Sequence, residues 1–184
     1  MENRLKAYLQ EQITDIEIKE IRDLRRIHGG ASRETYRFEM VYLDSGIEQK
    51  RGLIVRRDPV GSLIDTERAL EFVAYQSFYD TKVPVPMALI LEEDEKWLDR
   101  PFFIMEEIAD CESASPFGEP PYAKSAKQIG EQFWSILGQI AARDVDATDM
   151  PSVVDVPQLE NCWSRELNYW EGVINDDELE PHPL

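Results

Sequence analysis

The chain has 184 residues, of which 42% are hydrophobic and 10% aromatic, and its formal net charge is −17. This composition supports one domain with a core, or one domain and part of another, and it excludes a disordered chain. The excess of acid argues against a nucleic-acid partner, because binding a polyanion requires a basic face.

The first half of the chain alternates between strand and turn patterns. Residues 2–12 are typical of an amphipathic helix, and residues 16–27 predict a long strand that is bent or bulged where its apolar alternation changes phase. Residues 35–42 predict a second strand and residues 48–57 a third. The first two strands are joined by residues 28–32, His-Gly-Gly-Ala-Ser, so we expect a hairpin with small residues at its tip.

This hairpin tip has two interpretations. Gly29 and Gly30 can supply the positive φ of an ordinary turn. Alternatively, Gly29, Gly30, Ala31 and Ser32 can form a phosphate-covering loop, because missing side chains let backbone N–H groups approach an anion.

The third predicted strand ends in two cations, Arg56 and Arg57, and a helix follows it. Asp65 or Thr66 can cap this helix, which carries Glu71. A strand cation held by a helix acid suits a phosphate site, because the acid orients a long side chain that would otherwise lose entropy on binding. The alternative is a surface arginine and a surface glutamate without a partnership.

The remaining chain predicts two further strands and two long helices. The strands are at residues 87–92 and 101–108, and residues 110–122 have the composition of a linker or lid. The helices are at residues 123–143 and 158–174. The apolar stripe of the first helix predicts a helix packed in a core, and its members are Ile129, Phe133, Ile136, Leu137, Ile140 and Ala141. We therefore expect an α+β protein with a five-stranded antiparallel sheet.

Charge and cysteine content indicate which ligands and which cellular compartment suit the chain. Residues 1–108 hold 16 basic and 22 acidic residues, whereas residues 109–184 hold 4 basic and 15 acidic residues. The first part is therefore better suited to bind an anion. The acidic second part could bind a cation or could simply be a solvated surface. Two cysteines and two separate histidines have no metal-type spacing, so we expect no metal site. Because no apolar run approaches a membrane span and the start is not a signal sequence, we expect a cytoplasmic protein without a membrane segment.

In this order the segments resemble the N-terminal part of the aminoglycoside phosphotransferase/choline kinase family, which has a protein-kinase-like fold. The resemblance covers roughly residues 20–175 and depends on the ordered set rather than on one motif. The matching segments are Gly29–Tyr36, Leu53–Arg57, Glu71–Phe72, Val83–Pro86, Arg100–Glu107 and Ile129–Asp146. It implies a nucleotide-binding N-lobe at residues 1–108, followed at residues 109–184 by a hinge linker and the first helices of a partial helical C-lobe.

The resemblance implies ATP, or another nucleoside triphosphate, as the cofactor. Arg56 would contact its phosphates and pair with Glu71, while Arg57 would replace Arg56 if the register were shifted by one residue. The amides of Ala31 and Ser32 would cover the phosphates.

The resemblance also implies an adenine pocket and an acceptor. Met105 would lie at the back of this pocket, and backbone groups of Glu106 and Ile108 would bind the adenine edge with their side chains free. The acceptor would be a small-molecule hydroxyl, such as an aminoglycoside, a choline-like compound or a hydroxyacyl compound.

The sequence departs from the family pattern in one respect that concerns the chemistry. The catalytic His-Gly-Asp followed by Asn, and the later metal-binding Asp, do not occur in the 184 residues. Phosphoryl transfer depends on such groups, so we expect no catalytic residue in this chain, Mg²⁺ bound through residues outside it, and no activity of the chain alone. We expect a fragment of a longer enzyme or a natural remnant. The alternative is a non-catalytic nucleotide-binding or regulatory module that binds a basic partner through residues 109–184.

Overall fold

The computed structural model describes residues 1–27, 33–59, 68–110, 119–120 and 122–177. The main elements are α1 (Glu2–Gln12), β1 (Glu17–Ile27), β2 (Glu34–Asp44), β3 (Ile47–Arg57), α2 (Arg68–Phe78), β4 (Ala88–Glu92), β5 (Phe102–Glu106), α3 (Ala126–Ala141) and α4 (Cys162–Asp177). Short 3-10 helices are η1 (Ala123–Ser125), η2 (Val145–Ala147), η3 (Met150–Ser152) and η4 (Leu159–Asn161). The predicted α+β architecture is confirmed, and the predicted caps Asp65 and Thr66 lie outside the described residues.

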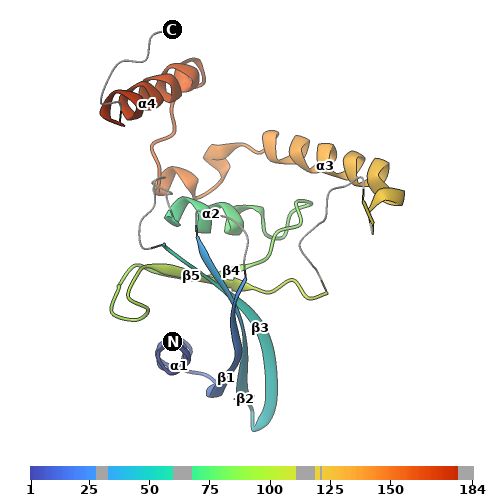
Figure 1. Ribbon diagram of the computed structural model, residues 1–184, viewed down its shortest axis with the longest axis vertical. Helices are drawn as coiled ribbons and strands as arrows, with labels where there is room; N and C mark the ends of the chain where they lie inside the picture. Colours follow the sequence, from blue (N-terminus) through green and yellow to red (C-terminus); the bar gives the residue numbers. More distant parts are fainter. Residues whose placement is uncertain (28–32, 60–67, 111–118, 121, 178–184) are drawn as a thin grey trace.

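The five strands form one antiparallel sheet in the order β1-β2-β3-β5-β4. The long strands β1, β2 and β3 follow one another as hairpins, and the shorter β5 pairs with the second half of β3 (Figure 1). The bulge expected in β1 is present, since the register shifts between Arg22 and Arg25 and Asp23 has a φ of 52°. A bulge of this kind bends the strand and increases its twist.

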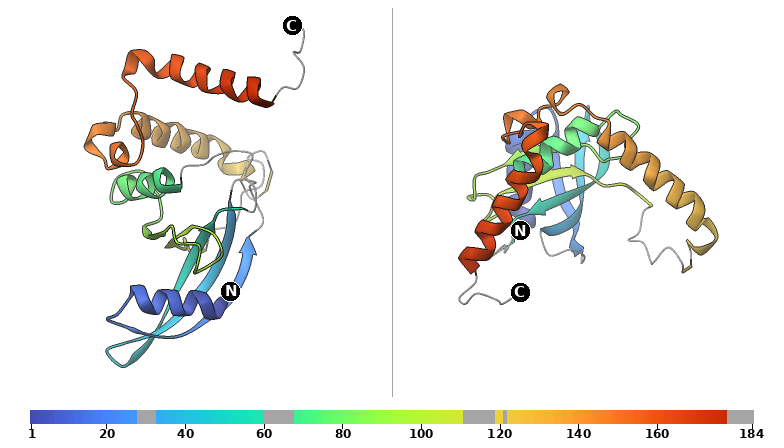
Figure 2. Two further views of the ribbon diagram at one scale, coloured as in Figure 1. Left: turned by 90° about the vertical axis from the view of Figure 1, so that its left-hand side faces the viewer. Right: turned by 90° about the horizontal axis from the view of Figure 1, so that it is seen from above.

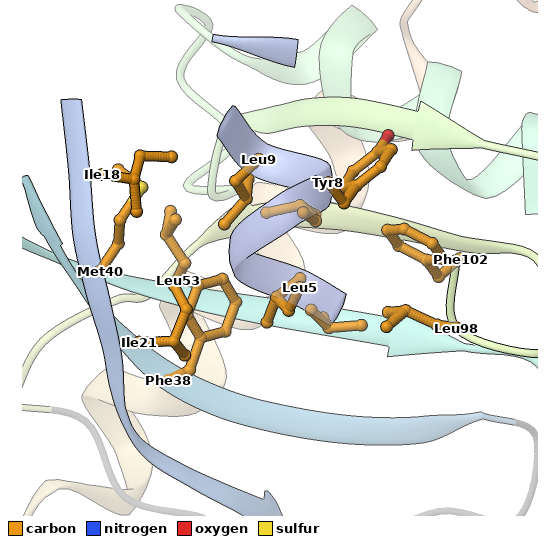
Figure 3. Close-up of a cluster of buried hydrophobic side chains, with 12 residues drawn as sticks. Leu5, Tyr8, Leu9, Ile18, Ile21, Phe38, Met40, Leu53, Leu98 and Phe102 are labelled. Carbon is orange, nitrogen blue, oxygen red and sulfur yellow. The ribbon is translucent and has the colours of Figure 1, made fainter. Parts of the chain in front are cut away.

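One face of the sheet carries the larger core, beneath α1. Leu5, Tyr8 and Leu9 recur at helical spacing, and all three are fully buried. Figure 3 shows them against strand residues of the sheet. The other buried members of this cluster are Ile18, Ile21, Phe38, Met40, Leu53, Val55, Leu98, Phe102 and Ile104.

The opposite face of the sheet packs against α2. Phe72 and Val73 of the helix form a second buried cluster with Ala88 and Phe103, and Met150 of η3 packs against it. Alternating residues of β5 therefore serve two cores, because successive side chains of a strand point to opposite faces. The face beneath α2 is the one on which the candidate site lies.

The helices α3 and α4 lie beyond α2, at the end of the molecule opposite the β2–β3 turn (Figures 1 and 2). No residue of α3 is buried, and Phe133 and Trp134 are 54% and 69% exposed. The prediction of a packed core helix is therefore wrong for α3. The apolar stripe forms as its period requires, but the structure places no described segment over it. No helix within the described ranges is both long and apolar enough to cross a membrane.

Candidate functional site

The end of β3 sends its two arginines to opposite faces of the sheet. Arg56 lies on the α2 side, where its guanidinium carbon is 5.8 Å from the centre of the Phe103 ring. Arg57 lies on the α1 side, where its guanidinium carbon is 5.4 Å from the centre of the Tyr36 ring. The register pairs Thr35 with Arg56, so both strands reach this level together. The two arginines cannot exchange roles without a shift in register.

Arg56 forms the ion pair with Glu71 that the sequence predicted. Its Nη2 atom is 2.8 Å from Glu71 Oε1, and both side chains are partly exposed. Glu71 lies in the first turn of α2. Within the described residues, the Nε atom of Arg56 is buried and has no hydrogen-bond partner. The pair thus fixes a cation on the α2 face of the sheet, where the Arg56 side chain is 22% exposed.

A third residue, Arg33, also binds Glu71. This contact was not predicted from the sequence. The Nε atom of Arg33 donates to Glu71 Oε2 at 2.9 Å, and its Nη1 atom forms an ion pair with Asp58. Arg68 of α2 forms an ion pair with the other oxygen of Asp58 at 3.3 Å. The result is an alternating chain of charges in the order Arg56, Glu71, Arg33, Asp58, Arg68.

The register of β2 and β3 explains why Arg33 and Asp58 meet. It pairs Glu34 with Arg57, so the residues one step outside that pair are neighbours. The sequence alone does not fix this register.

A second group of charges surrounds Glu34 on the α1 side. Arg57 Nη2 lies 2.5 Å from Glu34 Oε2, Arg100 Nη2 lies 3.1 Å from the same oxygen, and Arg26 lies 3.9 Å from Oε1. Burial alone would raise the pKa of Glu34, but the hydrogen bond and charge of Arg57, with the charge of Arg100, lower it below the ordinary value. Arg57 also donates to the carbonyl of Leu98 at 2.9 Å. Arg57, the alternative phosphate ligand, is thus held within the fold on the face away from Glu71.

Together the two groups concentrate positive charge at one end of the sheet. Arg100 connects them, because its Nη1 atom donates to the carbonyl oxygen of Asp58 at 2.7 Å. The network contains six arginines and three carboxylates, while the whole chain carries −17. A local excess of cations in an acidic protein marks this end of the sheet as the place that suits an anion.

The predicted phosphate loop, Gly29, Gly30, Ala31 and Ser32, lies outside the described residues. Its flanks are described: Ile27 ends β1, and its partner in the ladder is Thr35, which also pairs with Arg56. These two flanking residues therefore lie at the end of the sheet where Arg56 lies. The role of the loop stays a prediction.

The residues predicted to bind adenine lie at and after the end of β5. Met105 packs with the buried cluster beneath α2, on the face that carries Arg56, and Ile108 is exposed beyond the strand. The expectation of a free Glu106 side chain is wrong: Oε1 lies 2.7 Å from Arg51 Nη2, and Oε2 accepts a hydrogen bond from the Met87 amide at 3.3 Å. Strand β3 presents Arg51 beside Glu106, because the two strands are adjacent. The adenine contacts themselves stay predictions.

The residue after this strand, Glu107, crosses β3 to reach β2. Its Oε1 atom accepts a hydrogen bond from Arg37 Nε at 2.9 Å, and its amide donates to the Gly52 carbonyl at 3.3 Å. A Cβ atom at position 52 would overlap the Glu107 carboxylate. Glycine at this position therefore leaves the space that lets Glu107 tie β2 to the segment after β5.

Among the residues that the structure describes, no group of three or more histidine, cysteine, aspartate or glutamate side chains could hold a metal ion. The carboxylates of the charge network are separated by arginines, so the network suits an anion rather than a cation.

Comparison with known proteins places these observations in a family. The sequence model of the family described as "Phosphotransferase enzyme family" matches residues 23–176. A crystal structure of a protein assigned as an aminoglycoside phosphotransferase from Ralstonia eutropha JMP134 superposes with a TM-score of 0.63 at 18% identity. The alignment covers 97% of this chain and 48% of that one, so this chain spans about half the length of its structural relative. No curated protein matches the sequence significantly.

Proposed function

Because the chain belongs to the phosphotransferase enzyme family, we propose that it is the nucleotide-binding part of an ATP-dependent kinase for a small-molecule hydroxyl. Arg56 binds the nucleotide phosphates, and Glu71 orients it. The loop at residues 29–32 covers the phosphates, and Met105 with the backbone of Glu106 and Ile108 surrounds the adenine.

The observation that carries this proposal is the ion pair between Arg56 and Glu71. The pair fixes the direction of the arginine through one nitrogen, 2.8 Å from the carboxylate, and leaves other N–H donors of the guanidinium for a ligand. Charge-assisted hydrogen bonds from arginine to phosphate are strong and geometrically specific. The local excess of cations supports the same assignment.

In this function Mg²⁺ binds through residues outside this chain. A hard divalent cation requires several oxygen ligands, and the described residues do not cluster carboxylates in that way. The guanidinium of Arg56 has the charge and the donors that suit the phosphates of the nucleotide.

The acceptor in this function is a hydroxyl compound. Residues 109–184 hold 15 acidic and 4 basic residues, which favours a cationic acceptor such as an aminoglycoside or a choline-like compound. A hydroxyacyl acceptor is the remaining candidate, because fold alone does not identify a substrate.

The decisive experiment compares Arg56→Ala with Arg57→Ala in a titration with a fluorescent ATP analogue. Loss of a charge-assisted contact is worth about 1.5–3 kcal/mol, so we expect Arg56→Ala to weaken the affinity by at least about tenfold. Glu71 keeps Arg33 as a partner in this variant, so the melting temperature should change little.

The matched control, Arg57→Ala, should give the opposite pattern. Removing this side chain takes a principal cation from the partly buried Glu34, so the melting temperature should fall. The affinity of the folded protein for the nucleotide should stay the same. Equal affinity of Arg56→Ala and wild type, or no saturable binding by wild type, would overturn the proposal.

A further inference from the structure

We propose that Arg33 is a positioning residue that fixes the Glu71 carboxylate, so that Glu71 can aim Arg56 at the phosphates. This inference rests on the function proposed above, because it concerns the same site. Arg33 does not touch the nucleotide; it acts through Glu71.

The burial of Arg33 is the first observation. Arg33 is the only buried charged residue in the described part of the chain, and its side chain is 2% exposed. A buried guanidinium costs several kcal/mol of desolvation unless anions compensate it. Asp58 and Glu71, each from a different segment, supply that compensation. A side chain so enclosed, and already bonded to two carboxylates, cannot also serve as the ligand of a nucleotide.

The division of the Glu71 oxygens is the second observation. Oε2 accepts from Arg33 Nε at 2.9 Å, and Oε1 faces Arg56 Nη2 at 2.8 Å. Each oxygen therefore has its own cation. If Arg56 turns toward a phosphate, Glu71 keeps both its orientation and a counter-charge through Arg33. Because carboxylate orientation sets the direction of the arginine bonded to it, a fixed Glu71 lowers the cost of ordering Arg56.

The position of Arg33 in the chain is the third observation. It stands one residue before β2 and directly after the loop at residues 28–32, whereas Asp58 directly follows β3. The Arg33 side chain thus joins the start of β2, the end of β3 and the first turn of α2. It therefore holds α2, which carries Glu71, in a fixed position relative to β3, which carries Arg56.

The test measures the affinity of the full chain for a fluorescent ATP analogue in the presence of Mg²⁺, together with the melting temperature of each variant. Arg33→Met keeps the length of the side chain and removes the charge, and we expect it to weaken the affinity by about tenfold. Arg33→Lys restores a cation but lacks the planar guanidinium that binds two carboxylates at once. It should therefore recover part of the lost affinity. Arg4→Met is the matched control, because it removes an exposed ion pair with Asp99, and it should keep the wild-type affinity.

A double-mutant cycle with Glu71→Gln decides whether Arg33 acts through Glu71. If it does, Arg33→Met should weaken binding by less than about twofold when Glu71 is already glutamine, because coupled residues give non-additive effects. A structural role alone would give the same loss in both backgrounds. If Arg33→Met does not fold, the same cycle is measured with Arg33→Lys.

The outcomes separate this inference from the proposed function. Wild-type affinity in Arg33→Met, or an undiminished loss in the Glu71→Gln background, would overturn the role of Arg33 while nucleotide binding stands. No saturable binding by the wild-type chain would overturn both.

Discussion

Glu34, the first residue of β2, organises the charges on the α1 side of the sheet. A single carboxylate faces Arg26, Arg57 and Arg100. The hydrogen bond and charge of Arg57, the charge of Arg100 and a hydrogen bond from Tyr36 hold the pKa of Glu34 below its ordinary value of 4.5, even though burial acts in the opposite direction. A lowered pKa in the folded protein means that the ionised form stabilises the fold.

This pKa predicts the direction of acid sensitivity. The contribution of Glu34 is fully present above about pH 4.5, its unfolded pKa, and is lost as the pH falls through the lower folded pKa. Glu34→Gln should therefore lower the free energy of unfolding at pH 7 and flatten its decline between about pH 5 and pH 3. Urea denaturation at several pH values measures both effects. Parallel curves for variant and wild type across that window would contradict the assignment.

At the residue scale, the sequence predicted one half of the candidate site. The Arg56–Glu71 pair could be predicted because a strand end and a helix start are local patterns, and the two residues carry opposite charge. Arg33 and Asp58 could not be predicted in the same way. Their contact depends on the exact register of β2 and β3, and on burial, which charge patterns do not reveal.

At the scale of elements, α1 and α3 show what an apolar stripe can and cannot predict. The stripe of α1 is buried against the sheet, and Leu5 is 0% exposed, whereas Leu137 on the stripe of α3 is 43% exposed. Both stripes predicted a helix correctly. Periodicity gives the face that a helix would bury, but it does not give the surface that covers it. The five strands, in contrast, could be predicted one by one because each is a local pattern. The pairing of β5 with β3 was not predicted, because α2 and β4 separate the two strands in the sequence.

The two helices should therefore respond differently to loss of a leucine. Leu5→Ala removes a fully buried side chain and should lower the free energy of unfolding by about 2–5 kcal/mol. Leu137→Ala makes the same chemical change at an exposed position and should cost less than about 1 kcal/mol. Chemical denaturation of both variants measures the difference. Similar losses would show that α3 is packed in solution.

At the scale of the whole molecule, the exposed apolar side chains gather on α3 and α4. In α4 they recur at helical spacing as Trp163, Leu167, Trp170 and Ile174, all of them exposed. Monomeric proteins seldom expose a continuous row of large apolar side chains. The helices combine this surface with the acidic half of the chain.

This surface predicts strong binding of the dye 1-anilinonaphthalene-8-sulfonate by the native chain. Trp134→Gln, Trp163→Gln and Trp170→Gln together should reduce the dye fluorescence severalfold, because exposed aromatic area is removed. Ile47→Gln is the control, because Ile47 is 63% exposed but lies alone at the β2–β3 turn. It should leave the fluorescence unchanged. A native chain that does not bind the dye would contradict this exposure.

The crossing of Glu107 over Gly52 has a mechanical consequence for these parts of the molecule. The segment after β5 precedes α3 and α4 in the chain. Its residue Glu107 is bonded to Arg37 of β2, which is separated from β5 by β3. A swing of the helices would therefore exert torque on β2 as well as on β5. Because β2 begins at Glu34, next to Arg33, a load on this contact would reach the strand whose start lies beside the candidate site.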